Sequence, residues 1–248
     1  MNLQKYAHIF IFKPNHLTMK IYIYVSVFLF FILTACNKQN NTLTNREIAK
    51  GWELLFDGES VEKWKMFNGG NVAGWKVEAG ELHNSGADSY YGGDIVTKNQ
   101  YTNFELYIEW KIEPQSHSGI FFNVEEGVTN TIDEIGQKYQ LIDDWAKPLN
   151  DMQKSGANYN LFPPVRFTAK PVGNWNKSRL IVNKQRAEHW LNGKKVLEYV
   201  LWSDEWEAAK QSSEWANFPY FGEGKSGHIG LQDHGGLVAF RNIKIREL

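Results

Sequence analysis

The chain has 248 residues with 27 basic and 28 acidic side chains, so its formal net charge is −1. This balance argues against nucleic acid or an anionic membrane surface as the partner, because both attract strongly basic patches. Aromatic residues make up 15 % of the chain and include ten Trp, which predicts either dense core packing or flat platforms on which sugar rings stack.

The N-terminal segment has the pattern of a bacterial export signal. Lys20 precedes an apolar run over 21–35, which is short for a membrane span of roughly 20 residues but typical of a signal peptide. The run ends in Leu33-Thr34-Ala35-Cys36, which resembles a lipobox, so we expect cleavage before Cys36 and lipidation of that residue. A plain signal peptide with an incidental cysteine is the alternative.

Cysteine usage agrees with this interpretation. Cys36 is the only cysteine of the chain, so no internal disulfide forms, and lipidation would explain a lone thiol in an exported protein. The signal is already complete from Met19, which makes that residue an alternative start. We therefore expect a protein anchored by lipid to a bacterial membrane, in the periplasm or at the cell surface.

The rest of the chain divides into a tether and one domain. Residues 37–50 are expected to form the tether and a short helix: 37–45 is polar, and the capping-box spacing of Thr44 and Glu47 predicts a helix around Arg46 to Lys50. Residues 51–248 are expected to form a β-sandwich that carries the catalytic site. Alternating residues and turn signals predict its strands over 104–112, 118–124, 138–142, 179–182, 187–191, 195–199 and 237–245.

Turn and cap signals complete the fold prediction. Asn192-Gly193 predicts a tight hairpin, and Ser203 is a candidate N-cap for a second helix running through Glu214. Many short strands with one or two short helices favour an all-β fold, a two-sheet antiparallel sandwich of the jelly-roll type. The irregular stretches 125–134 and 143–177 are long enough to be loops that cover a site.

Three polar sets on predicted strands are candidates for a binding face. Lys138 and Gln140 point away from Tyr139 and Leu141, with Asp143 where the strand ends, although such a face is often plain surface. In the second set, Glu188 and Trp190 share an outer face. That pair suits a sugar contact but equally a solvated carboxylate covering an aromatic ring.

The third set comes from the C-terminal strands. If Ile229 and Leu231 face the core, then His228, Gln232 and His234 share the opposite face. Histidine is the commonest general base and a frequent metal ligand, and His117 is placed to join from a loop.

Several familiar catalytic patterns are missing. The sequence has no GxSxG elbow, no HExxH metal motif, and no ExDxE strand of the kind that a retaining glucanase on a sandwich fold uses. Nucleophilic serine chemistry and two-carboxylate glycoside hydrolysis therefore lack support.

Seven motifs in order resemble the 3-keto-disaccharide hydrolase domain family. They are GWELLFDGESVEKWK, HSGIFFNV, YQLIDD, SGANYNLF, PVGNWN, EHWLNG and HIGLQDHGGLVAFRNIKIREL, and they span Gly51 to Leu248. The resemblance implies a concanavalin-like jelly roll, frequent export as a lipoprotein, and an oligosaccharide or other glycoside already oxidised to a ketone at C3. A base would remove the acidified C2 proton, the enolate would expel the C1 substituent, and water would then add to the unsaturated product. A divalent metal that polarises the ketone is a further possibility.

On this resemblance, each candidate residue receives an expected role. The catalytic residues are His234 as general base, Glu188 and Asp143 as acid or orienting groups, and Lys138 as a stabiliser of developing negative charge. The substrate-binding residues are Gln140, Gln232, Trp190, Tyr159 and His117.

The chain departs from the usual family pattern at some of these positions. Lys138 stands where members often carry Glu, His117 begins the strand that often begins with Asn, and Asn174 replaces another common Glu. Two alternatives therefore stay open: a non-catalytic carbohydrate-binding module on the same fold, and an ordinary metal-dependent glycosidase.

Overall fold

The computed structural model describes residues 39–84, 86, 93–234 and 236–248. The predicted signal peptide with Cys36 and the start of the tether lie outside these residues. Within the described part of the chain, no helix combines the length and apolar character needed to cross a membrane.

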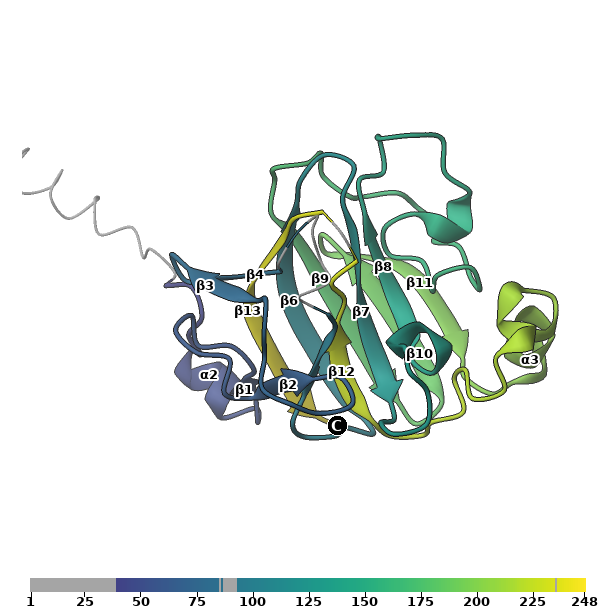
Figure 1. The fold of residues 1–248 in the computed structure, drawn as a ribbon, viewed down its shortest axis with the longest axis horizontal. Helices are drawn as coiled ribbons and strands as arrows, with labels where there is room; N and C mark the ends of the chain where they lie inside the picture. The colour runs from purple at the N-terminus through teal and green to yellow at the C-terminus, as the bar shows by residue number, and fades with distance from the viewer. Residues whose placement is uncertain (1–38, 85, 87–92, 235) are drawn as a thin grey trace, which may run out of the picture. The chain divides into compact units, whose positions relative to one another are not determined.

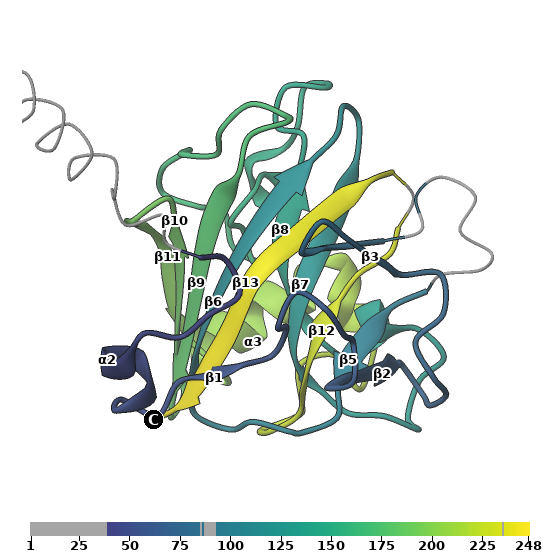
Figure 2. The same ribbon diagram turned by 90° about the vertical axis from the view of Figure 1, so that its left-hand side faces the viewer.

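Two antiparallel sheets pack face to face, as the two layers in Figures 1 and 2 show. The five-stranded sheet, here the front sheet, has the order β2 (Trp64–Met66), β5 (Ile95–Thr97), β12 (His228–Leu231), β7 (His117–Val124), β8 (Gln137–Ile142). The eight-stranded back sheet has the order β11 (Lys194–Val200), β10 (Arg186–Leu191), β9 (Asn176–Asn183), β6 (Phe104–Ile112), β13 (Val238–Glu247), β4 (Glu81–His83), β3 (Lys76–Glu78), with β1 (Glu53–Leu54) also paired to β13. The predicted jelly-roll sandwich is confirmed.

The period-two pattern decides which side chains enter the core between the sheets. On β6, Leu106, Ile108 and Trp110 are buried in the main core, and on β8 Tyr139 and Leu141 join them. Each buried aliphatic side chain contributes roughly 1.5–3 kcal/mol by leaving water, so these alternating positions fix the strand faces.

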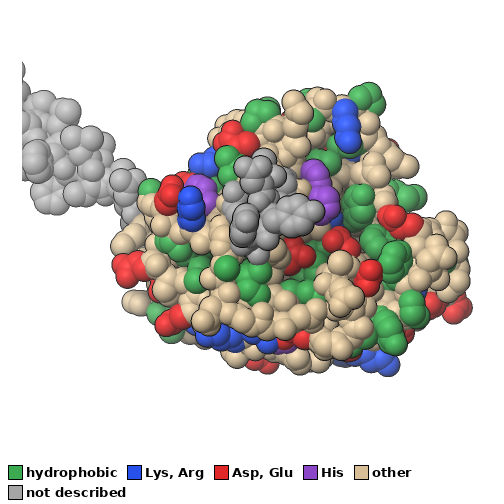
Figure 3. Space-filling model, viewed as in Figure 1, with side chains coloured by type: hydrophobic (Ala, Val, Ile, Leu, Met, Phe, Trp, Pro, Cys, Tyr) green, Lys and Arg blue, Asp and Glu red, His purple; other side chains and the backbone are tan. Residues whose placement is uncertain are grey.

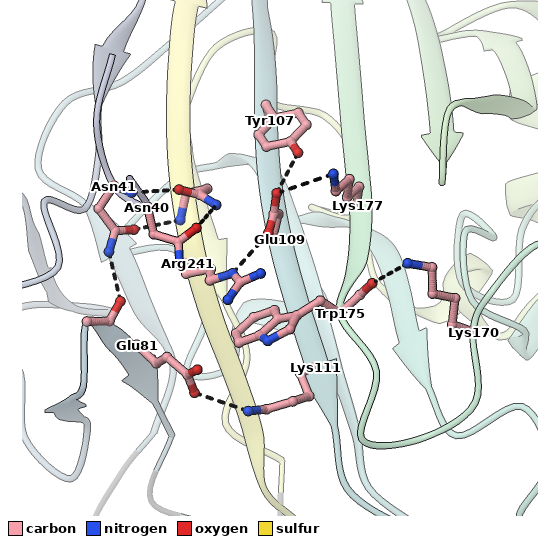
Figure 4. Close-up of polar contacts among 12 residues, drawn as sticks. Asn40, Asn41, Glu81, Tyr107, Glu109, Lys111, Lys170, Trp175, Lys177 and Arg241 are labelled. Carbon is pink, nitrogen blue, oxygen red and sulfur yellow. Dashed lines mark hydrogen bonds and ion pairs between the residues drawn. The ribbon is translucent and has the colours of Figure 1, made fainter. Parts of the chain in front are cut away.

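The outer face of the back sheet is closed by ion pairs and cation–π contacts. Glu109 accepts hydrogen bonds from the Tyr107 hydroxyl at 2.8 Å and from Arg241 Nε at 2.9 Å (Figure 4). Arg241 and Lys111 also lie over the Trp175 ring, at 3.9 and 4.7 Å from its centroid.

One strand departs from strict alternation because of a bulge. Alternation places Ile120, Phe122 and Val124 together, yet Val124 packs with Phe121 in a second, small cluster on the outer face of the front sheet. Asn123 adopts a left-handed φ of 54°, and the pairing of β7 with β12 shifts register at this point. The extra residue turns Val124 to the opposite face.

Two helices and several caps agree with the sequence. Thr44 and Glu47 form the predicted capping box at the start of α2 (Asn45–Ile48). Ser203 caps α3 (Asp204–Gln211), which ends before Glu214, because Glu214–Asn217 forms a separate 3₁₀ turn, η3. Asn192 and Gly193 both adopt positive φ, 50° and 79°, as the predicted hairpin turn requires.

The predicted loop 125–134 and the first part of the predicted loop 143–177 fold over the outer face of the front sheet, whereas Trp175 near the end of the second loop lies on the outer face of the back sheet. Ile132 in η1 (Ile132–Glu134) and the following Ile135 pack into the small cluster with Val96 and Phe121. The second stretch contains η2 (Asp151–Gln153) and contributes further residues to the same side. This covering leaves part of the front sheet open, and the open part holds the site.

Candidate functional site

A pocket of about 400 Å³ lies on the outer face of the front sheet. Strands β7 and β8 and the segments around η1, η2 and η3 supply its lining: His117, Thr131, Asp133, Glu134, Lys138, Gln140, Ile142, Lys147, Leu149, Gln153, Tyr159, Glu214, Trp215, Phe218 and His234. Figure 3 shows histidine side chains on this face of the molecule, with acidic and apolar side chains beside them. The sequence-predicted residues His117, Lys138, Gln140, Tyr159 and His234 therefore come together.

Lys138 lies across the floor of the pocket because Gly119 on β7, the partner of Gln140, has no side chain in its way. A Cβ atom on Gly119 would approach Lys138 Cγ and Cε to 2.8 Å, which is closer than such contacts allow. The absent side chain lets the Lys138 stem lie flat on the sheet while its ammonium group reaches the pocket.

Asp133 joins Lys138 to Gln232. Its Oδ1 atom lies 3.4 Å from Lys138 Nζ, and its Oδ2 atom accepts a hydrogen bond of 2.9 Å from Gln232 Nε2. Gln232, which the sequence placed in the site, thus stands directly behind the pocket lining. One carboxylate holds both a cation and an amide in fixed positions.

Aromatic rings complete the surroundings of Lys138. Its ammonium group lies 4.5 Å from the Tyr159 ring centroid and 5.6 Å from that of Phe121. Burial lowers the pKa of Lys138, and the negative charge of Asp133 partly opposes that shift. Burial, reinforced by Glu214, also raises the pKa of Tyr159, so its hydroxyl stays protonated at neutral pH.

Two imidazoles stand together at the pocket. The ring centroids of His117 and His234 are 4.6 Å apart, and His234 is the exposed member of the pair. Burial, followed by the charges of His234, Lys138 and Lys147, lowers the pKa of His117 to about 4. His117 is therefore neutral at pH 7, which leaves a neutral ring beside an imidazole that substrate can reach.

Two buried amide oxygens in this region have unused hydrogen-bonding capacity. Gln140 Oε1 and Gln232 Oε1 find no donor among the described residues, although both side chains are almost fully buried. A buried acceptor without a donor costs about 1–3 kcal/mol, so such groups usually receive a hydrogen bond from water or a ligand. Gln140 lines the pocket directly and is the better placed of the two.

The structure does not bring Glu188 and Trp190 to this pocket. Both point outward, as alternation predicts, but from β10 in the back sheet, where Trp190 Nε1 donates to Glu188 Oε2 at 2.8 Å. Glu188 also lies 3.5 Å from Arg186 Nε, and Arg179 lies over the Trp190 ring. Glu188 and Trp190 therefore do not share a face with Gln140, contrary to expectation. The alternation of side chains within a strand does not specify which sheet the strand joins.

Asp143 and His228 also lie away from the pocket lining. Asp143 accepts hydrogen bonds from the backbone amides of Gln115 and Trp145, so both of its carboxylate oxygens serve as turn caps. His228 is buried, with Nδ1 2.6 Å from the Thr97 carbonyl oxygen and Nε2 3.2 Å from Glu126. It ties strands and loop together rather than sharing a ligand face with His234.

The loops contribute pocket residues that the strand pattern of the sequence does not predict. Asp133 and Glu214 bring carboxylates, and Trp215 and Phe218 bring an aromatic wall. Their segments have no strand or long-helix periodicity. The one available signal is the spacing of Ile132 and Ile135, two apolar anchors in a polar loop, which fixes the position of Asp133 between them.

Asp94 is a further residue that the strand pattern does not predict. Its Oδ1 atom accepts a hydrogen bond of 2.9 Å from the Asp233 backbone amide. Burial, reinforced by the negative charge of Asp133, raises the pKa of Asp94 to about 7, while Lys138 opposes the shift. A carboxyl group that exchanges a proton near neutral pH therefore lies within electrostatic range of the Lys138–Asp133 pair.

The donor set does not suit a divalent metal. Across the described residues, no three His, Cys, Asp or Glu side chains gather as metal ligands would. The floor of the pocket carries the Lys138 ammonium group, which would repel a cation placed beside it. The chemistry available here is that of an imidazole base, an ammonium group and amide acceptors.

Comparisons with known proteins identify the family of this chain. The profile of the 3-keto-alpha-glucoside-1,2-lyase-like domain family matches residues 51–246. A 3-keto-disaccharide hydrolase of Bacteroides thetaiotaomicron is 32% identical over 230 residues, which cover 81% of this chain and 79% of that protein. A crystal structure from Parabacteroides distasonis, provisionally assigned as a glycosyl hydrolase, matches with a TM-score of 0.79 and 40% identity over 85% of this chain and 100% of its own. A second crystal structure from the same organism, also provisionally assigned as a glycosyl hydrolase, matches with a TM-score of 0.64 and 29% identity over 79% of this chain and 99% of its own.

Proposed function

Because the chain belongs to the 3-keto-alpha-glucoside-1,2-lyase-like domain family, we propose that it is a carbohydrate-active enzyme that cleaves 3-keto-glycosides. The named hydrolase relative and the glycosyl hydrolase structures support the broader class, a carbohydrate hydrolase. The observation that carries the finer proposal is a buried ammonium group on the floor of a pocket that also holds an accessible imidazole.

The reaction begins with proton removal from C2 of the oxidised sugar. His234 acts as the base, because it is the exposed imidazole of the pair at the pocket. As the C2–H bond breaks, its electrons form the C2–C3 double bond of an enolate, and negative charge grows on the C3 oxygen.

Lys138 stabilises that enolate. Its ammonium group is fixed by Asp133 and shielded by Tyr159, so it donates to the C3 oxygen without rearranging. Gln140 offers its unpaired Oε1 to a sugar hydroxyl and thereby orients the ring. Gln232 and His117 support this arrangement, the first through Asp133 and the second through ring contact with His234.

Elimination and hydration complete the cycle. The enolate re-forms the ketone and expels the C1 oxygen substituent, which takes a proton from the His234 imidazolium. Water then adds across the C1–C2 double bond, with its oxygen on C1 and a proton on C2, so the net change is hydrolysis and His234 ends neutral. None of these steps requires a metal ion.

Product analysis by mass spectrometry tests this proposal. Wild-type protein is incubated with a panel of 3-keto-disaccharides, with and without chelator, beside the variants His234→Ala and His83→Ala. His83 is the matched control, since it lies on β4 beside Glu81 in the back sheet. We expect chelator-insensitive cleavage that H234A loses and H83A keeps. Undiminished turnover by H234A would remove His234 as the base.

The same assay distinguishes the proposed enzyme from the two alternatives, a carbohydrate-binding module and an ordinary metal-dependent glycosidase. A binding module would hold unoxidised glycans at equilibrium and release no product from any 3-keto substrate. Cleavage of unoxidised disaccharides that chelator abolishes would instead indicate an ordinary metal-dependent glycosidase.

We also propose that the protein is exported and lipid-anchored at Cys36, on the basis of the lipobox-like sequence alone. Cells grown with a labelled fatty acid should yield labelled wild-type protein and unlabelled Cys36→Ser. Label retained on C36S would contradict the anchor.

A further inference from the structure

A second hollow of about 330 Å³ adjoins the pocket. Its lining combines exposed apolar side chains with amides and hydroxyls: Val128, Thr129, Asn130, Glu134, Asn217, Phe218, Pro219 and Tyr220. Glu134 and Phe218 border both hollows, so the two lie side by side. We call this second hollow the outer subsite.

The lining of the outer subsite differs from that of the pocket. The pocket holds Lys138, Lys147 and two histidines, whereas no basic side chain is among the described residues of the outer subsite. Tyr220 instead presents its ring with 51% of its surface exposed. Asn130 and Asn217 offer amides beside it. Flat aromatic faces with adjacent amides match a sugar ring, which has apolar C–H faces and hydroxyls on its rim.

Tyr220 is held in place although its ring is exposed. The next residue, Phe221, is buried and stacks on Trp215, with ring centroids 4.3 Å apart and planes within 4°. The Gly222 backbone amide donates to the Ile135 carbonyl at 2.9 Å, which joins this wall to the η1 wall across the outer subsite. The backbone that carries Tyr220 is therefore fixed before any ligand arrives, which lowers the ordering cost of binding.

We propose that the outer subsite binds the second sugar unit of the substrate, the unit that leaves with the C1 oxygen. This inference rests on the proposed function, which places the 3-keto ring beside His234 and Lys138 in the pocket. The two hollows then select 3-keto-disaccharides and longer 3-keto-oligosaccharides over glycosides with a small leaving group, with Tyr220 as a platform for the leaving sugar.

Steady-state kinetics with two substrates test the subsite. Methyl 3-keto-glucoside has no second sugar, whereas a 3-keto-disaccharide of two glucose units fills both hollows. For Tyr220→Ala we expect KM for the disaccharide to rise at least fivefold, with kcat within twofold and both constants for the methyl glycoside unchanged. Tyr220→Phe keeps the ring and should behave as wild type. Phe167→Ala is the matched control, because Phe167 has 52% of its surface exposed and lines neither hollow.

Failure of the subsite and failure of the proposed function give different results. If the wild type cleaves both substrates and Y220A keeps its KM for the disaccharide, the subsite is wrong and the reaction stands. If the wild type cleaves neither, the reaction is wrong, and the subsite is then tested by the equilibrium binding of the same 3-keto-disaccharide. A dissociation constant that Y220A leaves unchanged would overturn it.

Discussion

The outer faces of the two sheets carry the same kinds of side chain but differ in how completely the polar groups are paired with one another. On the back sheet, Glu105 is paired with Arg179 and Arg246. Glu109 accepts hydrogen bonds from Tyr107 and Arg241 (Figure 4), so both carboxylates are engaged. On the front sheet, Gln140 keeps a buried oxygen without a donor.

This difference shows what distinguishes a binding face from a structural one. Lysine, carboxylate and aromatic rings occur on both faces, so residue type alone does not separate them. The back sheet uses its polar groups on each other, and the loops over the front sheet hold theirs apart around a hollow. The binding face is distinguished by an unpaired buried oxygen that also lines a hollow, as Gln140 Oε1 does, because other unpaired amide atoms, on Asn123 and Gln137, lie outside the pocket lining.

The strongest test of the comparison replaces one lysine on each outer face with methionine. Lys138→Met keeps the bulk of the buried stem but removes the ammonium group that stabilises the enolate. We expect kcat to fall by about 10²–10³-fold, the usual cost of losing one preorganised donor. Lys177→Met removes a more exposed ammonium 3.9 Å from Glu109 and should change kcat less than twofold. Equal losses in the two variants, measured on a 3-keto-disaccharide, would erase the distinction between the faces.

A carboxylate of the back sheet should affect stability and spare activity. Glu105→Ala removes a buried carboxylate and leaves the partly exposed Arg179 and Arg246 without their shared acceptor. We expect the free energy of unfolding to drop by about 2 kcal/mol, with kcat/KM unchanged. Urea unfolding and kinetics on the same preparation measure both quantities, and a selective loss of activity would place function on this face.

Two glutamines of β8 provide a further comparison between a side chain at the pocket and one on the opposite face of the strand, with smaller expected effects. Gln140→Leu removes the acceptor that awaits the substrate, so we expect KM to rise about tenfold with stability unchanged. Gln137 faces the opposite way, and its Oε1 accepts from Trp206 Nε1 and Asn158 Nδ2. Gln137→Leu should therefore cost about 1–3 kcal/mol of stability. A reversal of these two outcomes would show that the unpaired oxygen is incidental.

Strand periodicity explains which parts of this arrangement the sequence predicts. Alternation around Tyr139 correctly turns Lys138 and Gln140 outward, because side chains on a strand change face at every residue. The same rule correctly turns Glu188 and Trp190 outward, yet it contains no information on which sheet holds them.

Long-range packing explains what the sequence does not reveal. Asp133 reaches the pocket because Ile132 and Ile135 anchor their loop to a small cluster on the outer face of the front sheet. That cluster requires Val124 on the outer face, which only the bulge at Asn123 provides. A left-handed residue inside an otherwise regular strand has no reliable pattern in a single sequence.

Acid should weaken the folded state through His117. Its pKa is about 4 in the folded protein, below the ordinary value near 6.5, so the unfolded chain binds more protons between these values. The free energy of unfolding should therefore fall as pH drops from 6.5 to 4. His117→Asn should remove on the order of 1 kcal/mol of that loss, discounted for partial exposure. The buried His189, whose pKa is also about 4, should still contribute a loss of the same sign in H117N. Urea unfolding at pH 7, 5.5 and 4.5 measures the slope, and an unchanged slope in H117N would contradict the assignment.

The smallest effect is expected at the carboxylate that the sequence placed in the site. Glu188 is engaged by Trp190 Nε1 and lies within 4.0 Å of Lys195 on the outer face of the back sheet, so Glu188→Ala removes no group that meets the substrate. We expect kcat and KM for a 3-keto-disaccharide to stay within twofold of wild type. The surface ion pairs it loses are worth less than about 1 kcal/mol. A tenfold fall in kcat at unchanged stability would mean that substrate also meets the back sheet, and a site confined to the front sheet would then be untenable.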